Sequence, residues 1–388
     1  MVRLISSAVL IAAQAYAFAV RGSSLQCQSS PPRLSLHDGI IHKDEFTSIR
    51  SARELADGTV LVSDGRERRL MALRFDGTPS SQIGREGKGP GEYIWVGKMF
   101  ATVGDSTILA DGANGRWTVF DGVRFSEHMP ADHPLVKAWG SVLSGAARTG
   151  QLLLLPRSWA TLPANRRMTP DSSPVILAER RSGRAQVVAQ LRRQPMRLEG
   201  SDERRGSVGG VDEVPVGTVH GLPEDEGAVL FADGWLAVAR VRPFRVDFRA
   251  PNGSWRRGTA LPVARIPVTR REREAYLERT AGNYTSAFGV AKPDASAFPE
   301  FIPPFVFPEQ SLLAASDGSL LIKRTRSADN RGNVYYVIDR NSRLRGELAL
   351  PPSQAIVGFG ARHVYLAETN ADDIVQLRRA PWPPVSTP

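Results

Sequence analysis

One glycine-rich run holds the charged side chains best suited to contact a ligand. Residues 83–93 read Ile-Gly-Arg-Glu-Gly-Lys-Gly-Pro-Gly-Glu-Tyr, and four of them are placed to line a ligand mouth: Arg85, Glu86, Lys88 and Glu92. The glycines equally suit a tight connection with positive φ, which the proline stiffens. The run therefore predicts either a ligand site or a purely structural loop.

The spacing of this run excludes two common phosphate-binding loops. A Walker loop has Gly, four residues and then Gly-Lys-Ser/Thr, but Gln82 stands at the first position and Gly89 follows the lysine. A dinucleotide fingerprint opens a helix, and no helical pattern follows Gly91.

No other local motif supplies catalytic or metal-binding residues. The sequence contains no His-Glu-x-x-His and no Gly-x-Ser-x-Gly, the patterns of zinc proteases and serine hydrolases. His128 and His133 stand five residues apart beside Asp132, which fits either a metal pair or two solvated histidines. We predict no catalytic residues and no metal ligands from local motifs, and a site gathered from distant segments stays open.

Two Asp–Arg pairs recur with equal spacing. Asp64 precedes Arg69 by five residues, and Asp111 precedes Arg116 by the same interval. A turn aspartate accepts backbone amides, and an arginine on the facing strand can reach its carboxylate. We expect each pair to fix a hairpin rather than to bind a metal.

The elements that position these residues are short β-strands. Apolar and polar residues alternate in runs such as 59–63 and 235–241, bounded by Gly, Asp and Asn. One turn-then-strand unit recurs six times, starting at Asp57, Asp105, Gly150, Asp233, Asp317 and Arg362. Three of the five intervals are about 45 residues, the length of a four-stranded propeller blade. The sequence predicts an all-β, six-bladed β-propeller of four-stranded antiparallel blades.

The other two intervals are about twice as long, and we assign the excess to insertions rather than to hidden blades. The first insertion covers 192–226. The second contains one helix, predicted over 269–281. Thr269 and Glu272 form a capping box at its start, and Gly282 is expected to end it.

The chain divides into a signal peptide at 1–19, a flexible leader at 20–36, the propeller at 37–379 and a frayed tail at 380–388. An open ring would leave an unpaired sheet edge. We therefore expect His37–Arg50 to supply a strand that completes the last blade.

The N-terminal segment predicts export to the periplasm or the exterior. A positive start, an apolar stretch and small residues within 1–19 fit a cleavable signal, and no membrane span is expected after its removal. Cys27 is the only cysteine, which excludes an intrachain disulfide. Lipoprotein anchoring through Cys27 is the alternative, but Gln26 before it suits lipid attachment poorly.

The net charge of +10 comes mostly from arginines scattered along the chain, since only six of the fifty basic residues are lysine. No stripe of basic and aromatic residues forms, so we expect no nucleic-acid partner. We predict that the chain is a monomer. Its expected partner is a protein or a small polar or anionic ligand.

The glycine-rich run resembles the blade-to-blade loop of six-bladed NHL-repeat propellers. Asp111 resembles the aspartate that ends their inner strand, and Asn114 and Arg116 resemble the Asn-x-Arg that comes after it. Over residues 50–125 the chain is similar to exported bacterial six-bladed propellers with a Gly-Arg-Glu-Gly-x-Gly-Pro-Gly-Glu loop. This resemblance implies the fold and no single activity.

These patterns leave two main functional hypotheses and, beside them, an anion- or polysaccharide-binding module that uses the arginine excess. The first is a non-enzymatic scaffold of the cell envelope or exterior that binds a ligand or a protein. The alternative is a metal-dependent propeller enzyme, similar to a lactonase or a lyase. Its site would lie on the central axis and hold a divalent cation such as Ca²⁺.

Overall fold

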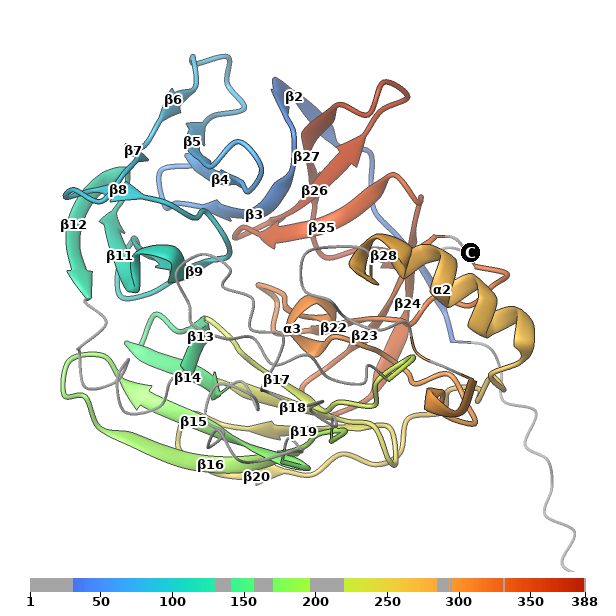
Figure 1. Ribbon diagram of the computed structural model, residues 1–388. Coiled ribbons are helices and arrows are strands. Elements are labelled where there is room, and N and C mark those ends of the chain that lie inside the picture. The colour runs from blue at the N-terminus through green and yellow to red at the C-terminus, as the bar shows by residue number, and fades with distance from the viewer. Residues whose placement is uncertain are drawn as a thin grey trace, which may run out of the picture. The chain divides into compact units, whose positions relative to one another are not determined.

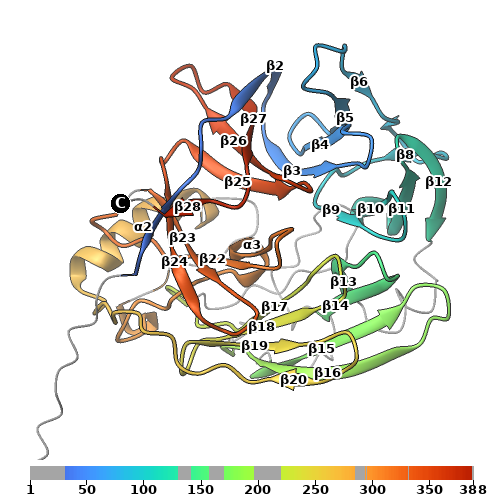
Figure 2. The same cartoon turned by 180° about the vertical axis from the view of Figure 1, so that it is seen from behind.

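A computed structural model describes residues 31–129, 141–156, 170–195, 220–284, 293, 295–330 and 332–386. Six blades surround a central axis (Figures 1 and 2), five as four-stranded sheets and one as a four-stranded blade extended by two short strands, which confirms the predicted six-bladed β-propeller. The predicted signal, Cys27 and His133 lie outside the described residues. No helix in the described ranges is long and apolar enough to cross a membrane.

The blades follow one another along the chain, and their strands are antiparallel. From the inner to the outer strand, blade 1 consists of β3 (Ile49–Glu54), β4 (Val60–Asp64), β5 (Arg69–Leu73) and β6 (Ser81–Gln82). Blade 2 consists of β9 (Met99–Ala101), β10 (Ser106–Asp111), β11 (Arg116–Asp121) and β12 (Arg124–Met129). Blade 3 consists of β13 (Ser141–Ala146), β14 (Gln151–Pro156), β15 (Ser172–Glu179) and β16 (Ala185–Arg192).

Blade 4 consists of β17 (Gly227–Leu230), β18 (Leu236–Arg240), β19 (Arg245–Arg249) and β20 (Trp255–Arg256). Blade 5 consists of β21 (Leu312–Ala314), β22 (Leu320–Lys323), β23 (Asn333–Ile338) and β24 (Leu344–Leu350). Blade 6 consists of β25 (Gln354–Phe359), β26 (His363–Thr369), β27 (Val375–Pro381) and β2 (Ile40–Phe46). Around the axis, contacts join β25 to β3, β3 to β9, β9 to β13, β13 to β17 and β17 to β21.

Each predicted repeat start lies at the beginning of the second strand of a blade. In blade 1, Asp57 accepts the Thr59 amide at 2.9 Å, and Gly58 between them has a φ of 83°, which glycine adopts without strain. The strand after this turn is buried on both faces because neighbouring blades pack against each of them. One such interface joins Ala237 of blade 4 to Ile322 of blade 5.

The ring closes as predicted. The N-terminal strand β2 pairs with β27, with Ile41 opposite Arg378. A second closure lies next to it, where β1 (Arg33–Ser35) pairs with both β24 and β28 (Val385–Ser386). The described parts of the predicted leader and tail therefore include strands, because their backbone groups extend the sheet of blade 5.

Each long interval includes a segment between two blades, 193–226 after β16 and 257–311 after β20, and residues 196–219 of the first lie outside the described residues. The second contains α2 (Arg270–Tyr284), η2 (Ala295–Ala297) and α3 (Pro308–Ser311). The predicted helix is confirmed, but its predicted end at Gly282 is wrong because α2 continues to Tyr284. Thr269 Oγ1 accepts the Glu272 amide at 3.3 Å, whereas the Glu272 carboxylate does not complete the capping box. It accepts the amide of Ala328 at 2.7 Å instead, and so attaches α2 to blade 5.

Candidate functional site

The glycine-rich run connects blades 1 and 2, and its charged side chains bind one another. It forms two short parallel strands, β7 (Arg85–Glu86) and β8 (Glu92–Tyr93). Arg85 Nε donates to Glu92 Oε1 at 2.6 Å, and the Gly89 amide donates to Glu92 Oε2 at 2.7 Å. The amide and then the guanidinium lower the pKa of Glu92.

The remaining polar groups of the run are held by residues of the two blades. The Arg116 guanidinium donates to three backbone carbonyls of the run, those of Lys88, Gly89 and Glu92, at 2.8, 2.9 and 3.0 Å. Glu86 pairs with Arg68 at 2.5 Å, and the Lys88 side chain is exposed. None of the four predicted ligand residues lines either of the two cavities that flank blade 4. The arrangement favours the structural interpretation of the run.

Asp64 and Asp111 are fully buried. Asp111 accepts two amides of the segment that leads to β9, at 2.9 and 3.1 Å, and Asp64 accepts the two equivalent amides before β3. Arg69 stays near Asp64 at 3.7 Å, but the predicted pairing of Asp111 with Arg116 is wrong because Arg116 binds the glycine-rich run. Both aspartates fix the chain where it enters a blade.

A cavity of about 440 Å³, here called the seam cavity, lies at the junction of blades 4 and 5. The β18–β19 turn, the β22–β23 hairpin and the insertion between β20 and β21 enclose it. Backbone hydrogen bonds hold the insertion in place: Leu261 N donates to Phe244 O at 2.8 Å, and Thr325 N donates to Pro304 O at 3.2 Å. The cavity is therefore part of the folded framework.

Apolar side chains make up most of the wall, among them Phe244, Leu261, Val263, Ile266, Phe301 and Pro303. The prolines keep the 301–304 segment extended, and the Ile302 amide donates to Ile266 O at 2.8 Å. Small-molecule sites occupy roughly 300–1,000 Å³ and combine apolar walls with a few polar groups. The seam cavity has the size and the lining of such a site.

Three residues of blade 5 with hydrogen-bonding side chains line this cavity, and these side chains make no hydrogen bond to the described residues. Thr325 Oγ1 is buried and unpartnered. The Tyr336 hydroxyl has no partner either, and burial raises the pKa of Tyr336 to about 12, so it stays protonated at neutral pH. The Arg324 guanidinium makes no hydrogen bond and lies 3.6 Å from Glu347 Oε1.

The opposite wall adds two arginines and one carboxylate. The Arg265 guanidinium stacks on the Phe301 ring, 3.7 Å from its centroid, which leaves its N–H edge free of that contact. Arg242 pairs with Glu224 at 2.6 Å. With Arg324, the lining contains three arginines and a single carboxylate, an excess of positive charge.

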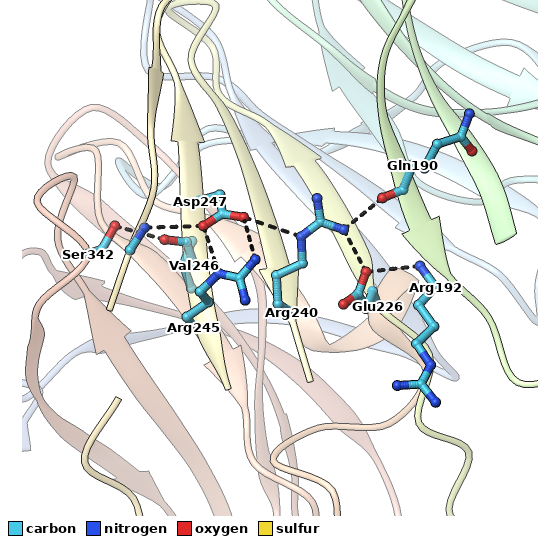
Figure 3. Close-up of polar contacts among 9 residues, drawn as sticks. Gln190, Arg192, Glu226, Arg240, Arg245, Val246, Asp247 and Ser342 are labelled. Carbon is cyan, nitrogen blue, oxygen red and sulfur yellow. Dashed lines mark hydrogen bonds and ion pairs between the residues drawn. The ribbon is translucent and has the colours of Figure 1, made fainter. Parts of the chain in front are cut away.

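A second cavity of about 690 Å³ lies between blades 3 and 4 and is lined mainly by polar groups. Figure 3 shows the ion network beside it, in which Arg240 donates to Glu226 at 2.6 Å and to Gln190 O at 2.7 Å. Arg240 and Arg245 also share the Asp247 carboxylate, at 3.3 and 3.1 Å. These charges neutralise one another, so the network joins the two blades.

The central axis carries a third group of polar residues. The short helix α3 lies near the centre of the ring (Figures 1 and 2), and Lys98 Nζ donates to the carbonyl of Glu309 in this helix. The Lys98 side chain contacts solvent, but surrounding protein desolvates it and lowers its pKa. Desolvation likewise raises the pKa of Asp225, whose carboxylate accepts the Gln194 amide at 2.8 Å.

In the part of the chain that the structure describes, no group of three or more His, Cys, Asp or Glu side chains is placed to hold a metal ion. We therefore derive no step through the Ca²⁺ that the enzyme hypothesis implies. His128 contacts Thr118 Oγ1 at 3.2 Å and stacks near Phe125.

Sequence reasoning missed the seam cavity because its walls come from three separate segments. Arg324 and Thr325 come after a strand without any motif, and Tyr336 alternates along an ordinary buried strand. The proline-rich stretch at 299–304 was the one visible signal, since it interrupts the regular elements before blade 5. That signal predicts an extended segment but does not predict what the segment covers.

Comparisons with known proteins yield structural likenesses only. No protein-family model matches the chain, and no curated protein matches it. A gluconolactonase from Xanthomonas campestris is 12% identical with a TM-score of 0.42, covering 91% of this chain and 95% of its own. A virginiamycin B lyase from Staphylococcus aureus is 8% identical with a TM-score of 0.41, covering 89% and 100%.

A calcium-binding protein, regucalcin, from Agrobacterium tumefaciens is 9% identical with a TM-score of 0.41, covering 91% of this chain and 97% of its own. These neighbours include enzymes of the kinds that the alternative hypothesis names. At these identities and TM-scores, their activities are not carried over to this chain.

Proposed function

We propose that this propeller is a binding protein that holds a small molecule with a largely apolar body in the seam cavity. The observation that carries the proposal is a largely apolar cavity of about 440 Å³ lined by Thr325, whose Oγ1 is buried and has no hydrogen-bond partner. A buried polar atom without a partner costs about 1–3 kcal/mol. A ligand that hydrogen-bonds to this hydroxyl recovers part of that cost.

A cavity-filling substitution tests this function. Ala264 lines the cavity, so Ala264→Trp should fill it, and Ala295→Trp is a matched control on an exposed residue of η2. The probe is Nile red, a neutral dye that fluoresces in apolar surroundings. We expect the dye to bind the wild-type protein and the control variant, and binding to fall at least tenfold in Ala264→Trp. Equal binding by all three proteins would refute the proposed site.

A second candidate function is acid–base catalysis at the central axis, in keeping with the enzyme alternative. It is favoured by the opposite pKa shifts of Lys98 and Asp225, both toward neutral pH, since such shifts concentrate at active sites. Its test is hydrolysis of a panel of γ- and δ-lactones by the wild-type protein and by Asp225→Asn. Activity that the variant loses would favour catalysis, and no turnover by the wild-type protein would count against it.

We also propose that the protein acts outside the cytoplasm, as the segment at 1–19 predicts. A binding protein in the periplasm or the exterior meets small ligands before they enter the cell. N-terminal sequencing of the mature protein tests this location. We expect a start after residues 17 to 19, and intact Met1 in the cytosolic fraction would contradict export.

A further inference from the structure

We infer that the seam cavity selects a carboxylate ligand, whose head group lies against Arg324, Thr325 and Tyr336 and whose apolar body lies along the Phe244 and Phe301 wall. This inference rests on the proposed function and adds the chemical class of the ligand. It concerns a monoanion with one apolar chain or ring system.

The unused donors of blade 5 carry the argument. The β22–β23 register places Ile322 opposite Tyr336, and the Arg324 amide donates to Val334 O at 2.8 Å. Arg324 and Tyr336 therefore lie two rungs apart on one hairpin, a spacing that places them on the same face. Thr325 lines the cavity together with both of them. One guanidinium and two hydroxyls match the two acceptor oxygens of a carboxylate.

The charge of the cavity selects an anion over a neutral or cationic head group. Three arginines line it against one carboxylate, Glu224, which is already paired with Arg242. Arg324 forms an ion pair with Glu347 at 3.6 Å, a separation that leaves the guanidinium without a direct hydrogen bond. A bound carboxylate forms the charge-assisted hydrogen bonds that Arg324 lacks in the free protein.

The apolar remainder of the cavity limits the body to which the carboxylate is attached. Phe244 packs against Tyr336, with ring centroids 5.6 Å apart, so the apolar wall begins next to the Tyr336 hydroxyl. A highly hydroxylated body would leave its polar groups unpaired along this wall. An aliphatic or aromatic carboxylate fits both parts of the cavity, and octanoate is a simple probe of this class.

The experiment is isothermal titration of octanoate and of 1-octanol, which share the apolar chain and differ in the head group. We expect octanoate to bind the wild-type protein at least tenfold more tightly than 1-octanol, a difference of about 1.4 kcal/mol. Arg324→Gln should remove that preference, and Tyr336→Phe should reduce it severalfold. Arg343→Gln is the matched control, since Arg343 is exposed and lies outside the cavity, and it should bind as the wild type does.

The possible failures are distinguishable. If both probes bind equally and Ala264→Trp abolishes both, the cavity is a binding site but the carboxylate inference is wrong. If octanoate binds and neither Arg324→Gln nor Ala264→Trp changes its affinity, octanoate binds elsewhere and the inference is again wrong. If neither probe binds the wild-type protein, the inference and the proposed function both fail.

Discussion

The connections between blades 1 and 2 and between blades 4 and 5 use their polar groups in opposite ways. In the first, residues 83–93 satisfy one another and receive the Arg116 side chain, as in the 2.6 Å pair of Arg85 and Glu92. In the second, the insertion leaves Thr325 and Tyr336 without hydrogen-bond partners among the described residues. The first connection fixes blade geometry, whereas the second encloses a space with unused hydrogen-bonding groups.

This difference shows why a distinctive motif need not mark a functional site. A tight turn requires particular residues at particular positions, because few side chains tolerate its backbone angles. An apolar cavity accepts many combinations of residues of suitable size and polarity. A motif search therefore finds the turn, and only the folded arrangement identifies the cavity.

The largest expected effect is on the stability of the first connection. Asp111→Asn replaces a fully buried carboxylate that accepts three backbone amides and the Asn114 side chain, so we expect a loss of about 3 kcal/mol in the free energy of unfolding. The measurement is urea denaturation, with Asp57→Asn at an exposed turn as the control. Octanoate affinity should not change. If Asp111→Asn bound octanoate more weakly but unfolded with the wild-type free energy, the first connection would take part in binding, and the contrast between the two connections would be wrong.

A smaller effect is expected from Gly91→Val, at about 2 kcal/mol. Gly91 has a φ of 72°, where a β-branched residue is strained, and its added Cβ would meet Phe125 at 3.1 Å. Gly89→Val is the internal control because the backbone at Gly89 is not left-handed and an added Cβ there would contact only the Glu92 side chain. Thermal unfolding of both variants checks the difference. Equal losses would mean that the loop conformation is not set by Gly91.

The smallest effect on stability is expected in the second connection. Thr325→Val keeps the shape of the side chain and removes an unpartnered hydroxyl, so stability should stay the same or rise by up to about 1 kcal/mol. Octanoate affinity should nevertheless fall severalfold. Denaturation and titration of the same variant check both results. A clear loss of stability would mean that the hydroxyl serves the fold, which removes the contrast between the two connections.

The sequence predicts the framework far better than the site. The second strand of each blade begins at a turn such as Asp57–Thr59, whose chemistry is local and therefore visible. The closure by β2 is expected from the need to avoid an open sheet edge. By contrast, Arg116 has two competing acceptors, Asp111 on the facing strand and the carbonyls of the glycine-rich run, and spacing along the chain does not reveal the second. Gly282 did not end α2, because a single glycine costs a helix only about 1 kcal/mol.

The predicted ligand residues bind one another or residues of the neighbouring blades for a related physical reason. Charged residues close together in sequence, such as Arg85 and Glu92, neutralise one another when the loop folds. The groups left free are those whose partners packing has removed, and packing is a property of the whole fold. Thr325 and Tyr336 are candidate ligand-binding residues only because the insertion between β20 and β21 folds over them.

A crystal structure of the protein soaked with octanoate tests the central claim most directly, namely that the ligand site is the seam cavity rather than the glycine-rich run. We predict density for one octanoate in the cavity, with a carboxylate oxygen within hydrogen-bonding distance of Arg324 and of Thr325 Oγ1 or the Tyr336 hydroxyl. An empty cavity with octanoate bound at Arg85 or Lys88 would contradict the claim.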